Sequence, residues 1–291
     1  MPSYIRTRTE FAVNSFTADD QAGGSVAAFA DGGFIVVWVT TDPTQDGHDQ
    51  AIKAQRFDSS GAKVGTEFLV NSSASGAQFS AEVATLANGN FIVTWTTNIS
   101  DDDSNGIKAQ LFSASGEPIG AEFKVNLATG SHFTSNVAAL ADGGFVISWD
   151  DWNSFDMKAQ VFDSNGARVG GVITVNTKTS YDQEYGDIVG LKGGGFVATW
   201  RTTDPSGDGS GEAIKAQVFS ASGAKVGGEF LVNSLKAGDQ YQPTVGALAG
   251  GGFVILWESW DTSQDGSSNA LKGQIFSASG APVGAEFRVN T

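Results

Sequence analysis

The chain has 291 residues, and 40% of them are hydrophobic, which is enough for a packed core and excludes wholesale disorder. The formal net charge is −15, from 17 basic and 32 acidic residues, so nucleic acid is not an expected partner, because binding it depends on Lys and Arg. The absence of cysteine excludes disulfides and thiolate metal sites. No apolar run approaches about 18 residues, so no membrane insertion is expected.

Five copies of a Gly-Phe-aliphatic-Trp core follow one another along the chain. The cores are Phe34–Trp38, Phe91–Trp95, Phe145–Trp149, Phe196–Trp200 and Phe253–Trp257. A strand of small residues precedes each core, as Val26–Phe29 does in the first unit. A Lys-Ala/Gly-Gln strand and a Glu-Phe-x-Val-Asn box follow, as at Lys53 and Glu67. Four short strands in each unit of roughly 50 residues are typical of a β-propeller.

Glycine-containing turns separate the first strand from the second and the third from the fourth. Asn88-Gly89 and Ser60-Gly61 are examples, at places where a tight hairpin needs a positive φ. The two remaining connections of each unit are longer and polar. We therefore expect the variable loops to gather on one face of a disc, with the small-residue strand innermost.

The sequence thus predicts an all-β fold, a closed five-bladed β-propeller built from five tandem four-stranded repeats in a single domain, 1–291. The units are approximately 15–71, 72–126, 127–176, 177–233 and 234–290. The Glu-Phe-x-Val-Asn box also occurs at 10–14, which we predict to be an extra closing strand. Which terminal box takes the outermost position, 10–14 or 286–290, is left open.

From Thr9 to Asn290, the repeated pattern resembles a repeat of about 50 residues from large secreted bacterial proteins, the adhesin-like and haemolysin-type calcium-binding exoproteins. The resemblance implies an extracellular or cell-surface location and a binding role, without naming a ligand. The Gly-Gly-x-Gly-x-Asp nonapeptide typical of the calcium domains of such proteins is absent, and no Sec-type signal is visible.

The loops between the Trp strand and the Lys strand are acidic, and three of them share Asp-x-x-x-Asp-Gly. Ca²⁺ binds oxygen ligands, and a short loop that turns at Gly can wrap several carboxylates around one ion. Ca²⁺ is therefore the candidate cofactor; the alternative is ordinary Asp/Gly turn chemistry in solvated loops. The candidate ligands are Asp42, Asp46, Asp101, Asp103, Asp204, Asp208, Asp261 and Asp265.

The other long connection brings amide, imidazole and aromatic side chains into most units. Aromatic faces commonly stack on sugar C–H groups while amides bond the hydroxyls, which makes these residues candidate glycan ligands; packing between blades is the alternative for Phe and Tyr. Two further tryptophans lie among polar residues outside the repeat core. The candidates are Gln78, Phe79, His132, Phe133, Trp152, Gln183, Tyr185, Gln240, Tyr241 and Trp260.

We expect a non-enzymatic, lectin-like propeller with several similar sites for a glycan or polysaccharide on one face. The alternative is a structural or protein-docking module of a secreted adhesin, with a cell-surface protein as partner. A polysaccharide-degrading enzyme is the lesser alternative, because near-equivalent loops favour repeated binding over one catalytic centre. Such an enzyme needs one loop unlike the others, and the third unit has the shortest, from Asp150 to Met157.

Overall fold

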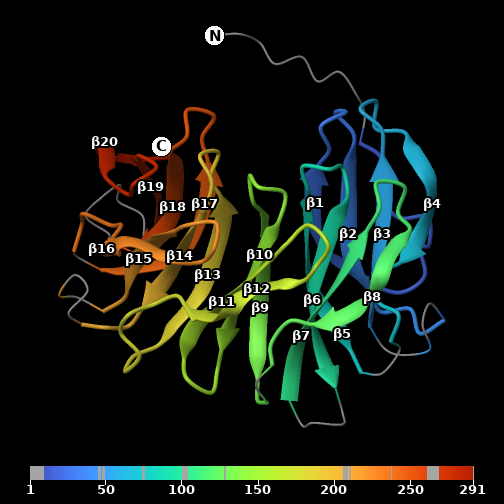
Figure 1. The fold of residues 1–291 in the computed structure, drawn as a ribbon, viewed down its shortest axis with the longest axis horizontal. Helices are drawn as coiled ribbons and strands as arrows, with labels where there is room; N and C mark the ends of the chain where they lie inside the picture. Colours follow the sequence, from blue (N-terminus) through green and yellow to red (C-terminus); the bar gives the residue numbers. More distant parts are fainter. Residues whose placement is uncertain are drawn as a thin grey trace.

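The structure is a computed structural model that describes residues 10–44, 47, 50–73, 76–99, 104–127, 129–205, 209, 211–236, 238–260 and 269–290. It contains five antiparallel sheets, each of four strands in chain order (Figure 1). The all-β class and the five four-stranded units are therefore confirmed. Within these ranges, no helix is long and apolar enough to cross a membrane.

The four strands of each sheet correspond to the four segments of the repeat. The first strands are β1 (Gln21–Ala28), β5 (Gln78–Thr85), β9 (His132–Ala139), β13 (Gln183–Gly190) and β17 (Asp239–Ala247). The second, which carry the repeated Trp, are β2 (Phe34–Thr40), β6 (Phe91–Ile99), β10 (Phe145–Asp151), β14 (Phe196–Thr202) and β18 (Phe253–Trp260). The third are β3 (Ala51–Phe57), β7 (Ser104–Phe112), β11 (Asp156–Phe162), β15 (Ala213–Phe219) and β19 (Ala270–Phe276). The fourth are β4 (Lys63–Leu69), β8 (Pro118–Lys124), β12 (Arg168–Thr174), β16 (Lys225–Leu231) and β20 (Pro282–Arg288). We number the sheets one to five in chain order.

The first strand of each sheet lies innermost, as the small residues predict. β1 packs against β5, β5 against β9, β9 against β13, and β13 against β17, so that the sheets follow one another around a centre (Figure 1). Gly190 shows why small residues are needed here, because a Cβ at this position would lie 1.9 Å from the carbonyl oxygen of Ala139.

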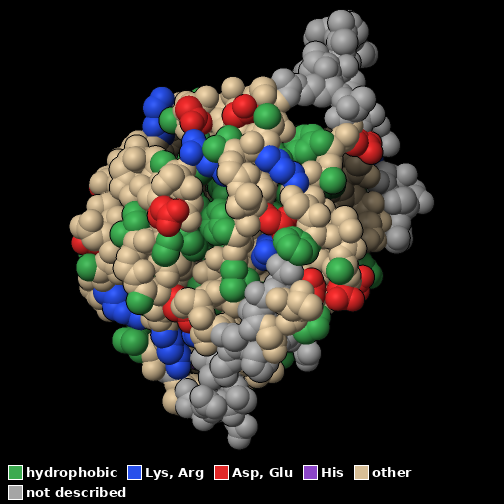
Figure 2. Space-filling model, turned by 90° about the vertical axis from the view of Figure 1, so that its right-hand side faces the viewer, with side chains coloured by type: hydrophobic (Ala, Val, Ile, Leu, Met, Phe, Trp, Pro, Cys, Tyr) green, Lys and Arg blue, Asp and Glu red, His purple; other side chains and the backbone are tan. Residues whose placement is uncertain are grey.

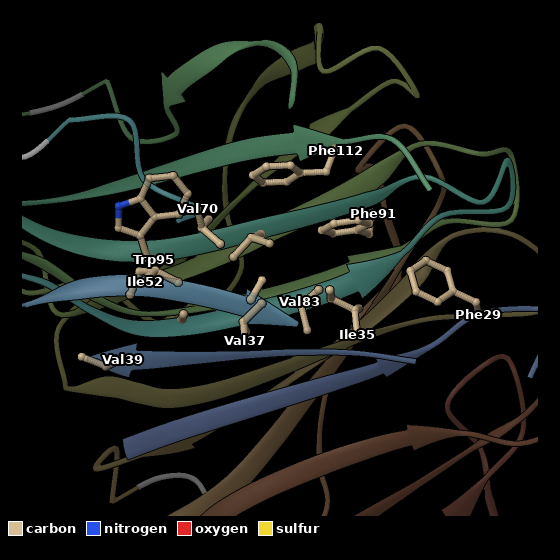
Figure 3. Close-up of a cluster of buried hydrophobic side chains, with 13 residues drawn as sticks. Phe29, Ile35, Val37, Val39, Ile52, Val70, Val83, Phe91, Trp95 and Phe112 are labelled. Atoms are coloured by element: carbon tan, nitrogen blue, oxygen red, sulfur yellow. The ribbon is translucent and has the colours of Figure 1, made fainter. Parts of the chain in front are cut away.

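The core consists of four clusters, each formed between two successive sheets. In the first cluster, Ile35 and Val37 of sheet one meet Val83 and Phe91 of sheet two (Figure 3). The positions of Ile35, Val83 and Phe91 pair in the same way in the other three clusters. Each sheet therefore has a forward face, which meets the next sheet, and a backward face, which meets the previous one.

Polar residues of the repeat hold each sheet together. The Asn of the box extends the ladder beyond the fourth strand; Asn126 Oδ1, for example, accepts a hydrogen bond of 2.7 Å from the Ile107 N–H. The Lys of the third strand pairs with the Glu of the fourth, with 2.7 Å between Lys108 Nζ and Glu122 Oε1. The other Glu122 oxygen accepts the N–H of Ser72, at the end of sheet one, so the box also joins neighbouring sheets.

Two expectations about ring closure need correction. Residues 10–14 form no strand, because sheet five already has four strands of its own and β20 is its outermost one. Among the described residues, no strand of sheet five packs extensively against sheet one, so there are four inter-sheet interfaces for five sheets. Figure 1 shows sheets one and five on either side of a gap in the ring.

The net negative charge does not produce a surface of one sign on the side that Figure 2 shows. Acidic and basic side chains are interspersed there among polar and apolar ones. The charge of this side is therefore consistent with ordinary solvation.

Candidate functional site

The amide candidates are core residues, which corrects their prediction as ligand-binding groups. Gln78, Gln183 and Gln240 are buried, and the Oε1 of each accepts a hydrogen bond of 2.7–2.9 Å from the indole N–H of the repeated Trp in its sheet. In the third unit, His132 takes this position and is also buried, with its Nδ1 3.7 Å from Asp151 Oδ1. A buried Trp N–H needs an acceptor, so the three glutamines serve the fold; the indole N–H of Trp149, in the sheet of His132, has no such acceptor among the described residues.

The aromatic candidates divide into packed and exposed residues. Phe79 packs against the first core cluster. Phe133 lies 4.7 Å from the exposed ring of Trp152, and Tyr241 lies 5.3 Å from the exposed ring of Trp260. The structure thus brings together two aromatic pairs, one in sheet three and one in sheet five.

Of the eight aspartates predicted to bind metal, only Asp42 and Asp204 are among the described residues; Asp46, Asp101, Asp103, Asp208, Asp261 and Asp265 lie outside them. Asp42 is buried, and its Oδ1 accepts the N–H and the hydroxyl of Thr44, at 2.9 and 2.7 Å. Asp204 is buried as well, with Oδ2 3.8 Å from Lys215 Nζ. The part of the chain that the structure describes contains no group of three or more potential metal ligands.

A pocket of about 340 Å³ lies where sheets four and five meet, and we call it the Arg201 pocket. Its lining residues are Tyr185, Arg201, Tyr241, Gln242, Glu258 and Trp260. The Arg201 guanidinium stacks on two rings, 4.8 Å from the centre of Tyr185 and 5.8 Å from that of Tyr241. The pocket therefore has aromatic walls with a cation between them.

Bulges in the innermost strands shape this pocket. The register of β13 shifts between Glu184 and Asp187, and Tyr185 adopts a φ of 53° within the bulge. β17 has a similar shift between Tyr241 and Thr244. Because a bulge re-aims side chains, Tyr185 is half exposed although it lies in an innermost strand.

Carboxylates surround Arg201. Its guanidinium bonds Glu212 Oε2 at 2.6 Å and also contacts Glu184. Although burial opposes the charged form, the bonds and charges of Glu212 and Glu184 raise the pKa of Arg201. Burial raises the pKa of the Glu212 carboxyl despite Arg201, and the nearby charges of Asp239 and Glu184 add to the effect.

Asp239 lies beside the pocket and bonds its lining residue Tyr241. Its Oδ1 accepts the Glu212 N–H at 3.2 Å, and its Oδ2 accepts the Tyr241 hydroxyl at 3.1 Å. Burial, together with the charges of Glu212 and Asp239, raises the pKa of Tyr241. A carboxyl with a raised pKa that lies beside an ionisable pair in a pocket is typical of a catalytic acid.

Asp150, near the end of β10, lies at the neighbouring junction. Its Oδ2 accepts the N–H of Tyr185 at 3.1 Å, which holds the bulge of β13 in place. Burial, with a smaller contribution from the charge of Glu184, raises the pKa of Asp150 to about 7. Asp150 therefore supports the pocket wall from behind Tyr185.

Two other carboxyls with raised pKa values lie on innermost strands. Burial is the main cause for both Glu82 and Asp187, and the charge of Asp187 adds to the shift of Glu82. Glu82 accepts the Ser25 hydroxyl at 2.6 Å, and Asp187 accepts the Thr244 hydroxyl at 2.8 Å. Each carboxyl therefore links two neighbouring sheets, which is a structural role.

The sequence reading missed Arg201, Glu184, Glu212 and Glu258. Arg201 and Glu258 occupy one repeat position, the residue after the repeated Trp, where the other units have Val39, Thr96 and Asp150. This position lies on the forward face of its sheet, so Arg201 borders the junction with sheet five, whereas Glu258 lies on the forward face of sheet five itself. The change of residue type at this position from unit to unit was the feature of the sequence that could have identified Arg201 and Glu258 as site residues.

Neither a family model nor a curated protein matches the chain. Among solved structures, a protein of unknown function from Dyadobacter fermentans has a TM-score of 0.61 at 11% identity, over 93% of this chain and 83% of that chain. The NanB sialidase of Streptococcus pneumoniae has a TM-score of 0.58 at 8% identity, over 96% of this chain and 63% of its own. The α-L-arabinofuranosidase of Fusarium graminearum in complex with arabinobiose has a TM-score of 0.56 at 11% identity, over 93% of both chains. At these identities the likeness shows the fold.

These comparisons correct the expectation of a non-enzymatic, lectin-like protein. The neighbours whose activity is named are enzymes, a sialidase and an arabinofuranosidase, and they share the fold over most of this chain. The near-equivalent loops favoured repeated binding over a single centre. The positions at which one junction differs from the rest carry the opposite indication.

Proposed function

We propose that the chain is a glycoside hydrolase and that the Arg201 pocket is its active site. The observation that carries the proposal is a carboxyl of raised pKa, Glu212, held beside a pocket that has a second carboxylate, Glu258, and aromatic walls. Hydrolysis of a glycosidic bond uses two such carboxyl groups on either side of the bond. The fold shared with an arabinofuranosidase and a sialidase supports this function.

Glu212 is the proton donor. Its raised pKa keeps the carboxyl protonated at a higher pH than usual, and the proton passes to the oxygen of the leaving sugar as the glycosidic bond breaks. Glu258 lines the pocket and supplies the second carboxylate, which activates the attacking water or forms the glycosyl bond itself. Arg201 holds Glu212 and Glu184 in place.

The charge of the pocket favours a neutral sugar. With Glu212 protonated as the donor, Glu184 balances the positive charge of Arg201, and an anionic sugar would meet the carboxylate of Glu258. Trp260, Tyr241 and Tyr185 offer faces for the C–H groups of a sugar ring. We therefore expect an arabinofuranoside-type substrate rather than a sialoside.

Paired aryl and alkyl α-L-arabinofuranosides test the two roles. Glu212→Gln should lose about 100-fold or more in kcat with an alkyl leaving group but much less with a dinitrophenyl group, which needs no proton. Glu258→Gln should lose activity on both substrates. Glu117→Gln removes an exposed carboxylate far along the chain and is the matched control. Wild-type protein inactive on arabinofuranosides and on arabinan would overturn the proposal.

Three expectations from the sequence stay proposals beside this function. Extracellular or cell-surface location suits a polysaccharide substrate, and fractionation of the native producer tests it. A cell-surface protein partner is tested by a pull-down in which arabinan does not displace the captured protein. Calcium binding is tested by calorimetric titration of chelator-treated protein, and the hydrolysis proposed above requires no calcium.

A further inference from the structure

The five sheets form an arc with a free face at each end. These two end faces correspond to the two sides of the interface that recurs four times between successive sheets. In the part of the chain that the structure describes, sheet five has a forward face with no sheet packed in front of it, and sheet one has a backward face with none packed behind it. The forward positions of β18 and β19 carry Val254, Leu271 and Ile275, where inner sheets carry buried Val, Ile and Leu. These two faces together form what we call the seam.

Apolar side chains at the seam are more exposed than the side chains at the same repeat positions in the inner sheets. Val26 of β1 is 64% exposed, whereas Val83, at the same position in β5, is 7% exposed. After β20, Val289 is 44% exposed, whereas Val125, its equivalent after β8, is 0% exposed. The same side chains that form core elsewhere therefore lie open at the seam, at a cost of roughly 25 cal/mol for each Å² of apolar surface.

Residues 10–16 occupy one part of the seam and make the contacts that the box of a preceding sheet makes elsewhere. The ring of Phe11 lies 5.4 Å from Phe57, just as Phe68 lies 5.5 Å from Phe112 between sheets one and two. The Ser15 N–H donates to Glu67 Oε2, just as the Ser72 N–H donates to Glu122 Oε2. The segment thus takes the place that the box of a preceding sheet would take.

A cavity marks the part of the seam that residues 10–16 leave open. It has a volume of about 280 Å³ and lies on the backward face of sheet one. Its walls include Val13, Val36 and Trp38. In sheet four the corresponding backward surface is covered by sheet three, whose Met157 side chain packs against Gly186.

We propose that the seam is a docking surface for one further repeat unit of the same pattern. That unit would insert three strands, with a Gly-Phe-aliphatic-Trp strand in the middle, and residues 10–14 would stand beside its third strand as the box does in other units. Continuity with the four existing interfaces is the argument, because each seam face has the residues of a face that is covered elsewhere.

The test appends residues 73–112, a copy of β5 to β7 with its leading connection, to the C-terminus of the full chain. Tethering makes the encounter intramolecular and raises the effective concentration. Hydrogen exchange of the β1 amides should slow at least tenfold, and that of β10 should not change. A matched control carries Ile92→Asp and Val93→Asp in the appended copy only, one substitution on each face, and should leave β1 exchange as in the parent chain.

Equal exchange in β1 for the matched and control extensions would overturn the proposal. Slower exchange that rises with protein concentration equally for the matched and control extensions would also overturn it, because association would then protect β1 without the apolar faces of the unit. A second extension, a copy of residues 178–219, guards against a first copy that fails to fold. Arabinofuranosidase activity is measured in parallel, and its loss or absence bears on the Arg201 pocket alone.

Discussion

Neighbouring side chains of β13 serve different purposes because a strand alternates its faces. Gln183 points into the core, where it holds the indole of Trp200. Glu184 contacts Arg201, and Tyr185, turned outward by the bulge, lines the pocket. One core residue that defines the repeat and two site residues that depart from it therefore occupy three consecutive positions, because the bulge interrupts the alternation.

The proton donor makes a prediction about pH. Because the pKa of Glu212 is raised, the carboxyl loses its proton as pH rises through that value, and kcat/KM on an alkyl arabinofuranoside should fall with it. Glu212→Gln should remove this alkaline limb from the residual activity. Unchanged alkaline limbs in wild type and variant would assign the proton donor to another group. The measurement is a pH profile of kcat/KM.

Asp150 makes a prediction about stability. Its pKa is about 7 in the folded chain and about 4 when unfolded, so the folded state binds one more proton between these values and the unfolding free energy falls as pH rises from 4 to 7. Asp150→Asn should remove this fall, with a gain over wild type that grows to at most about 4 kcal/mol above pH 7. Urea unfolding at pH 4.5 and 8 measures it, with exposed Asp19→Asn as control. A gain equal at both pH values would contradict the assignment.

The fourth strand of each sheet is the element that ties the array together. Its outward positions are exposed, so it contributes little to the core. Its Glu pairs with Lys of the third strand and accepts a backbone N–H from the end of the preceding sheet, as Glu122 does with Lys108 and Ser72. The repeated box therefore encodes contacts within a sheet and between sheets.

Acid should weaken this connection. Although burial raises the pKa of Glu122, its hydrogen bonds with Lys108 and Ser72 outweigh burial and hold the pKa below the usual value. The stabilisation is present above pH 4.5 and is lost as pH falls through the lowered pKa. Glu122→Gln should cost about 1 kcal/mol at pH 7, and the cost should shrink as pH falls below 4.5 in chemical unfolding. Glu117→Gln should cost nothing at either pH.

At the scale of the whole molecule, position in the arc determines how much each sheet is covered. Sheets two, three and four have a neighbour on both faces, whereas sheets one and five have a neighbour on one. Each inter-sheet cluster contains residues from two sheets, so a sheet does not complete a core by itself. The array resembles a repeat protein in which stability depends on contacts between nearest neighbours.

Hydrogen exchange should therefore follow a gradient along the chain. Amides of β10, in the middle sheet, should exchange slowest, and those of β2 and β18 should exchange faster, because the end sheets can open while losing a single interface. Mass-spectrometric exchange on the unextended chain measures this. Uniform protection across β2, β10 and β18 would mean that the five sheets open as one unit.

Much of the fold could be predicted because the same pattern of strands and turns recurs in all five units. Each copy of Phe91–Trp95 or its equivalents is a short, nearly continuous apolar run of the kind that buried strands carry, and glycine turns mark the hairpins, so strand number and order follow. The candidate site could be predicted only in part: Tyr185, Tyr241 and Trp260 were identified as aromatic candidates, whereas Arg201 and Glu212 were not. Alignment of the units identifies residues that recur, and the charged residues of the site were missed because they do not recur.

The sequence by itself determined the five sheets, their strands and the small innermost residues, because these depend on short-range periodicity and turn chemistry. The tertiary structure alone decided that Arg201 of β14 meets Tyr241 of β17, that Gln78 faces a Trp instead of solvent, and that the arc leaves a seam. Such outcomes depend on how far each sheet rotates from the last. That rotation is set by packing between residues distant along the chain, which no local pattern encodes.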